Sequence, residues 1–212
     1  MKKKIALLLA CVMAFGIAVG GTLAWLTATD DPVVNTFAPS TINIDLTETF
    51  NKDTDGKDGN DAWEKKMVPG DTLAKDPKVT VKAGSEACWL FVAVTESTNL
   101  DTFITYQVAT GDGKWTQLSG YENIYYRNVT TEDIGKDFYI LKGNDEYQNG
   151  CVTVNTSVTK ANMETIKETS SQPTLTFNAC AVQSAHLETV AKAWEQADPT
   201  FKTLAIATPV NP

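Results

Sequence analysis

The sequence predicts an all-β fold, a jelly-roll β-sandwich with a short helix near the C-terminus. Short strand patterns recur along the chain, and glycine- and asparagine-containing turn signals separate them. Residues 88–94 form an uninterrupted apolar run, typical of a central strand that is covered on both faces. Only residues 185–197 show a clear helical pattern, so we expect one helix to cover a sheet face.

The first half of the sandwich follows from alternation and turn chemistry. Residues 42–46 alternate apolar and polar side chains, which predicts a strand with one buried face. Residues 68–71 read Val-Pro-Gly-Asp and predict a turn with proline and glycine in its central positions. Residues 76–82 open with Asp-Pro and predict a strand with Val79 and Val81 pointing inward.

The second half is expected to add six more strands before the helix. Their ranges are 103–109, 114–118, 124–129, 138–141, 151–158 and 175–182. In the helix, one face should carry the apolar side chains of Leu187, Val190, Ala191 and Trp194. The Asp-Pro pair at residues 198–199 should end it, because proline disfavours helical backbone at the residue before it.

The N-terminus predicts a secretory signal peptide. Three lysines precede an uncharged apolar run over residues 5–19, and the small residues Thr22 and Ala24 occupy the positions that signal peptidase accepts. We therefore expect cleavage between Ala24 and Trp25. An uncleaved anchor is the alternative, since residues 5–29 carry no charge. The predicted organisation is a leader at 1–24, an N-terminal segment at 25–40 and a β-domain at 41–212.

The net charge excludes some classes of binding partner, and the cysteine count limits the possible disulfides. The formal net charge is −8, and it becomes more negative once the basic leader is removed. Such a chain repels nucleic acid and anionic membranes, so membrane contact is expected only through the uncleaved leader. Outside the leader, Cys88, Cys151 and Cys180 are too few for a disulfide framework. Two arrangements are compatible with the sequence: one disulfide bridge with one free thiol, or three free thiols.

An acidic loop at residues 51–61 is the one candidate cation site. Asp53, Asp55 and Glu64 fall at positions 1, 3 and 12 of an EF-hand register. Lys57 and Asp58 occupy positions 5 and 6, where a ligand and a glycine are required. A solvated acidic turn is therefore favoured over a calcium site, and no cofactor is expected.

Catalysis is not predicted. The single histidine, His186, cannot build a zinc site of the H-E-x-x-H kind, and Glu188 two residues away does not share its helical face. No serine lies in a nucleophile elbow, and Cys151 has no flanking catalytic motif.

Three blocks of the sequence carry a family resemblance. They are residues 20–24, Thr27, 35–37 and 42–46; then 68–71, 75–82 and 86–89; and finally 177–184, where Cys180 replaces a tyrosine-like residue. These blocks resemble the TasA/camelysin family of Gram-positive bacteria, whose leaders are cut by a SipW-type signal peptidase.

The resemblance implies a secreted jelly-roll subunit that polymerises with itself into biofilm-matrix fibres, with other matrix proteins as a further class of partner. In that assembly an N-terminal donor strand completes a sheet of the next subunit. The residues assigned to this donor strand are Trp25, Leu26, Val33, Val34 and Phe37. The alternatives are a disordered N-terminus, a monomeric adhesion or calcium-binding module on the cell surface, and the metallo-endopeptidase activity linked to the camelysin name.

Overall fold

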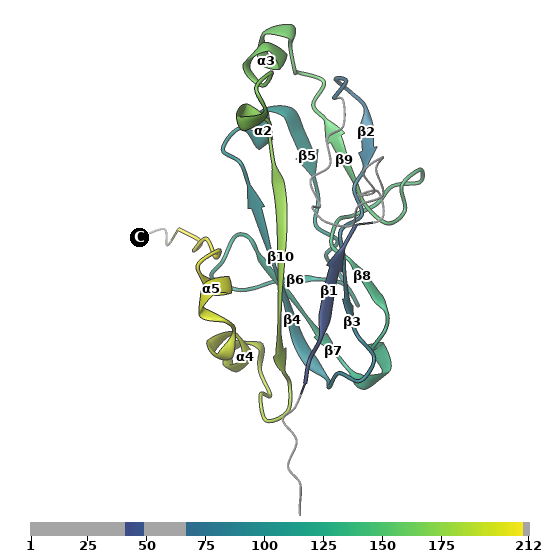
Figure 1. The fold of residues 1–212 in the computed structure, drawn as a ribbon, viewed down its shortest axis with the longest axis vertical. Helices are drawn as coiled ribbons and strands as arrows, with labels where there is room; N and C mark the ends of the chain where they lie inside the picture. The colour runs from purple at the N-terminus through teal and green to yellow at the C-terminus, as the bar shows by residue number, and fades with distance from the viewer. Residues whose placement is uncertain (1–40, 49–66, 210–212) are drawn as a thin grey trace, which may run out of the picture. The chain divides into compact units, whose positions relative to one another are not determined.

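A computed structural model describes residues 41–48 and 67–209. These residues form three antiparallel sheets with a few short helices, so the all-β prediction is confirmed (Figure 1). The strands are β1 (Ile44–Thr47), β2 (Thr72–Ala74), β3 (Lys78–Val81), β4 (Cys88–Glu96), β5 (Ile104–Tyr106), β6 (Thr116–Gln117), β7 (Ile124–Val129), β8 (Asp137–Tyr139), β9 (Cys151–Val154) and β10 (Leu175–Gln183). The α-helices are α2 (Leu100–Phe103), α3 (Lys160–Thr165), α4 (Val190–Gln196) and α5 (Pro199–Lys202).

The strand order shows how the sheets are built. Two sheets pack face to face, one ordered β1-β3-β8 and the other β10-β4-β7-β6. The third sheet is ordered β2-β9-β5. All strand pairs are antiparallel in the described residues.

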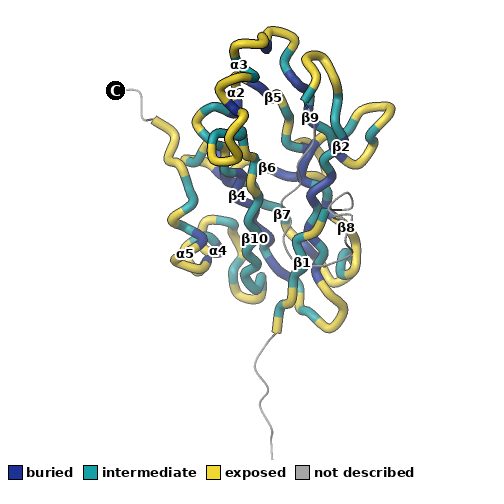
Figure 2. The backbone as a smooth tube through the Cα atoms, turned by 45° about the horizontal axis from the view of Figure 1, so that its top comes forward, coloured by how far each residue is buried: buried dark blue, intermediate teal, exposed yellow. Residues whose placement is uncertain are grey.

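Strand β4 is the centre of the sandwich, as its apolar run predicts. Leu90 and Val92 point to the core shared with the β1-β3-β8 sheet, where Val79 and Val81 meet them without solvent exposure. Phe91 and Ala93 point the other way, toward α4 and α5. Figure 2 shows this buried centre, with exposed residues concentrated in the loops. Both faces of β4 are therefore covered, which explains why it does not alternate polar and apolar residues.

The C-terminal helix covers the second face but begins later than predicted. His186 has φ +64°, a left-handed conformation that an α-helix does not contain. Helix α4 starts instead after Thr189, whose hydroxyl accepts a hydrogen bond from the backbone N–H of Lys192. Leu187, Val190 and Trp194 pack in the apolar cluster as predicted, but Ala191 is exposed and Ala193 is buried in its place.

Residues 198–199 end α4 as predicted, and they also begin a second helix. The carboxylate of Asp198 accepts hydrogen bonds from the N–H groups of Thr200 and Phe201, and Pro199 occupies the first helical position of α5. Phe201 then packs into the same apolar cluster as Phe91.

The turn at residues 68–71 is confirmed, since Gly70 has φ +92° and the N–H of Asp71 bonds to the carbonyl of Val68 at 3.0 Å. Strands β5, β6 and β9 are shorter than predicted. Strand β2 and helices α2 and α3 were not predicted, because three to six residues give too little periodicity to detect. They enclose a second apolar cluster, centred on Leu100, Phe103 and Val154, on the third sheet.

Candidate functional site

The longest edge strand, β10, is the first candidate site. Within the described part of the chain it pairs with β4 alone, through nine residues in continuous register. Its sequence, LTFNACAVQ, contains neither a charged residue nor a proline. None of its residues is fully buried, although most are apolar. Natural proteins usually protect such an edge with charge, proline, a bulge or a covering loop.

The hydrogen-bond pattern identifies which backbone groups of β10 are free. The N–H of Ser184 donates to the carbonyl of Ala87 at 3.0 Å, and the N–H of Ser97 donates to the carbonyl of Thr174 at 2.9 Å. In an antiparallel pair such bonds recur at every second residue, so the even-numbered residues of β10 face β4. The odd-numbered residues then direct their N–H and C=O groups outward; these are Leu175, Phe177, Ala179, Ala181 and Gln183.

Strand β1 has a similar free edge beside β10. The N–H of Lys82 donates to the carbonyl of Asn43 at 2.8 Å, so Ile44 and Leu46 direct their backbone groups away from β3. The two strands approach to within 8 Å between Cα atoms without pairing (Figure 1). Within the residues that the structure describes, one side of the sandwich is thus a seam between two unpaired edges.

The side chains at this seam are apolar and face inward. Ile44 and Leu46 of β1 and Phe177 and Ala179 of β10 pack on the core between the sheets while remaining partly exposed. A further strand placed here would find backbone partners along β10 and an apolar surface beside it. The arrangement can therefore bind an extended peptide by strand addition.

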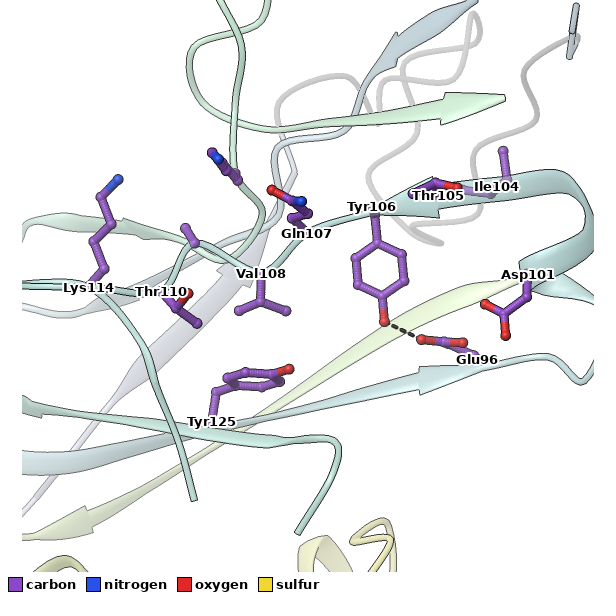
Figure 3. Close-up of a pocket in the computed structure, with 12 residues that line it drawn as sticks. Glu96, Asp101, Ile104, Thr105, Tyr106, Gln107, Val108, Thr110, Lys114 and Tyr125 are labelled. Atoms are coloured by element: carbon purple, nitrogen blue, oxygen red, sulfur yellow. Dashed lines mark hydrogen bonds between the residues drawn. The ribbon is translucent and has the colours of Figure 1, made fainter. Parts of the chain in front are cut away.

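A cleft of about 650 Å³ lies at the C-terminal end of β4, where Glu96 lines it (Figure 3). The hydroxyl of Tyr106 donates a hydrogen bond to the carboxylate of Glu96, and Tyr125 lies beside Val108 on the same wall. Burial, the hydrogen bond to Glu96 and its charge raise the pKa of Tyr106. Burial and the charge of Glu96 also raise that of Tyr125. Both phenols therefore stay protonated and can act as hydrogen-bond donors, not as bases.

The two residues considered as zinc-site candidates lie in an exposed segment before α4. His186 and Glu188 are exposed, and His186 sits in the turn before α4 instead of on a helix. No cluster of three or more potential metal ligands occurs in residues 41–48 and 67–209.

The structure decides between the two cysteine arrangements. The three described cysteines are all free thiols. Cys88 points into the sandwich core and Cys180 toward the α4–α5 side, so the same sheet separates them. Burial raises the pKa of Cys88 to about 11, and it also raises the pKa of Cys151 and Cys180.

Several predicted site residues lie outside the described residues. They are the cleavage-site residues Ala24 and Trp25, the donor-strand residues Leu26, Val33, Val34 and Phe37, and the loop carboxylates Asp53, Asp55 and Glu64. The sequence predicts β10 as a strand but does not predict that it is an edge strand. Its lack of charge was the available signal, but central strands share that property.

No family model, curated protein or solved structure matches this chain. None of the helices in the described ranges is long and apolar enough to cross a membrane.

Proposed function

We propose that this protein is a secreted structural subunit, of the TasA/camelysin kind, that polymerises by strand addition into extracellular matrix fibres. The observation that carries the proposal is the free edge of β10, where five consecutive odd-numbered residues direct backbone groups outward. A nine-residue apolar edge of this kind is a template for another strand.

The proposed donor is the segment of residues 25–39 in a neighbouring subunit. It carries the apolar residues Trp25, Leu26, Val33, Val34 and Phe37, and it precedes β1 in the sequence. Main-chain hydrogen bonds would supply the affinity, and the partly exposed apolar side chains of the seam would select the side chains of the donor.

Such an assembly forms an open filament unless the rotation from one subunit to the next closes it into a ring. The donor segment and the acceptor strand β10 are different surfaces of one subunit, so their contact is heterologous. Each bound subunit then presents a new β10 edge, which is the requirement for a filament.

Export fits the same scheme. A SipW-type peptidase cutting between Ala24 and Trp25 would release the donor from the leader, and only then could the donor dock. The protein would act at the cell surface or in the matrix of a Gram-positive bacterium, without a catalytic step.

We also assign the sandwich to the jelly-roll class; the supporting feature is that the chain crosses between the two packed sheets from β3 to β4 and from β7 to β8.

One substitution separates strand addition from folding. In Ala179→Pro, proline removes an N–H that points away from β4 and that the fold does not use. We expect a folded monomer that no longer elongates fibres, as seen by electron microscopy and circular dichroism. The matched control, Ala179→Ser, keeps the N–H and a small side chain and should still polymerise.

A second control tests whether the even-numbered residues of β10 form the hydrogen bonds to β4. Asn178→Pro removes an N–H that faces β4 and should destabilise the fold itself. Fibres that form normally from Ala179→Pro would refute β10 as the acceptor edge.

A further inference from the structure

Arg127 on β7 is the only arginine in a chain that otherwise uses lysine for its basic residues. Its guanidinium lies 3.7 Å from the centroid of the Phe138 ring and 5.7 Å from that of Trp115. A planar guanidinium can stack on an aromatic face, whereas the ammonium of lysine cannot. The two rings therefore hold the orientation of the guanidinium.

The hydrogen bonds of Arg127 are incomplete. Its Nη2 donates to the carbonyl of Gly113 at 3.1 Å, and its Nε is buried without a hydrogen-bond partner among the described residues. No carboxylate among the described residues forms an ion pair with it. Burial lowers the pKa of Arg127, although a guanidinium stays charged at neutral pH. The remaining Nη hydrogens are left for a group in the adjacent cleft of about 450 Å³.

The walls of this cleft have unbalanced charge. Lys114 and Lys142 line it without an ion-pair partner in the described part of the chain. The cleft carboxylates are already paired, Asp133 with Lys136 at 2.9 Å and Asp137 with Lys78 at 2.6 Å. Among the described residues, Arg127, Lys114 and Lys142 thus line this cleft without an ion-pair partner, in a protein whose net charge is −8; the two lysines also line the cleft of Figure 3.

We propose that this cleft binds the carboxylate of a small hydroxylated ligand, such as a sugar acid, with Arg127 as the principal contact and Lys114 and Lys142 beside it. The free Nη hydrogens match the two oxygens of a carboxylate. A monoanion fits better than a phosphate dianion, because Asp133 and Asp137, although each is paired with a lysine, still place carboxylate oxygens in the same walls. Tyr139 and Gln148 supply polar groups for ligand hydroxyls.

The site is separate from the proposed assembly edge, since β10 contributes no residue to the cleft. Binding and polymerisation can therefore be tested independently. The failure of one proposal would leave the other standing.

The test is calorimetric titration of the full chain with galacturonate, and with galactose and inorganic phosphate as comparison probes. We expect saturable binding of galacturonate, no binding of galactose and weaker binding of phosphate. Arg127→Lys keeps the charge but loses the planar fork, and should weaken galacturonate binding at least about tenfold.

The exposed lysines provide variants that should not disturb folding. Lys114→Gln with Lys142→Gln should weaken binding about threefold to fivefold, and Lys160→Gln, exposed outside the cleft, should change nothing. As the chain has one arginine, a single Arg Nε–Hε signal in ¹⁵N NMR should shift on titration. Absence of galacturonate binding, equal binding of galactose, tighter binding of phosphate, or unchanged affinity in the double lysine variant would overturn the proposal.

Discussion

The indole ring of Trp194 lies against the ring of Phe91, with centroids 5.3 Å apart and planes inclined by 54°. This contact joins α4 to the central strand β4. The indole N–H also donates to the hydroxyl of Tyr121 at 3.1 Å, so Trp194 is held from two elements. Aromatic pairs in such tilted geometry add to the stability given by burial alone.

Trp194→Ala should therefore lower the free energy of unfolding by about 3 kcal/mol, because it removes a large side chain from the cluster under α4. Urea denaturation would measure the change. Lys192→Ala on the exposed side of the same helix is the control and should cost less than about 0.5 kcal/mol. An equal effect of the two substitutions would contradict the role of Trp194.

A pH-dependent contribution is expected from the ion pair that links β3 to β8. The ammonium of Lys78 lies 2.6 Å from one carboxylate oxygen of Asp137, and the hydroxyl of Thr80 donates to the other at 2.6 Å. These bonds, first of all that from Lys78, lower the pKa of Asp137. A lowered folded-state pKa stabilises the protein above the usual carboxyl pKa of about 4, and this stabilisation is lost as the pH falls below it.

Asp137→Asn should accordingly reduce stability at pH 7 by less than about 1 kcal/mol, since the pair is partly exposed and screened by solvent. The difference from the unaltered protein should shrink as the pH falls below the usual carboxyl pKa of about 4. Thermal unfolding at a series of pH values would show it. A difference that grows on acidification would have the wrong sign.

Cys88 should be unreactive in the folded protein. Its side chain is fully buried, and burial raises its pKa to about 11, so at pH 8 it is an inaccessible thiol. Ellman's reagent should label it only on unfolding, while the partly exposed Cys151 and Cys180 react earlier. Labelling of Cys88 at the rate of Cys180 in the folded protein would contradict the packing of β4.

Mass spectrometry of the secreted protein should give an N-terminus at Trp25. The small residues at positions 22 and 24 and the apolar run before them carry this prediction. A membrane-bound form that keeps its leader would support the anchor alternative.

Deletion of residues 25–37 should give a folded, β-rich monomer that makes no fibres. A synthetic peptide of residues 25–39 should bind this truncated protein and block elongation of full-length subunits. Replacement of Val33, Val34 and Phe37 in the peptide by aspartate should abolish the effect, because the charges would be buried without partners.

Two results would contradict this donor assignment. Fibres that form equally well after the deletion would show that another segment mediates assembly. A truncated protein that cannot fold would place the segment in the core of its own subunit.

The elements that could be predicted are those in which the spacing of apolar residues within the element itself indicates the buried faces. The alternation around Val79 and Val81 located β3, and the apolar run at residues 88–94 identified β4 as a central strand with two covered faces. The turn containing Gly70 followed from proline and glycine in positions with restricted backbone angles. Each of these depends on a few neighbouring residues, so sequence alone determined them.

Other features required contacts between distant residues. Nothing in LTFNACAVQ distinguishes an edge strand from a central one, because that depends on which strand lies alongside it. The start of α4 depended on the left-handed backbone at His186. The cleft at Arg127 depended on Phe138 and Lys142, which lie later in the sequence and contact the cleft only in the folded protein. Sequence determined which residues turn inward along β3 and that both faces of β4 are covered. Only the tertiary structure decided which edges stay unpaired among the described residues and which charges meet, because both depend on contacts between residues distant in the sequence.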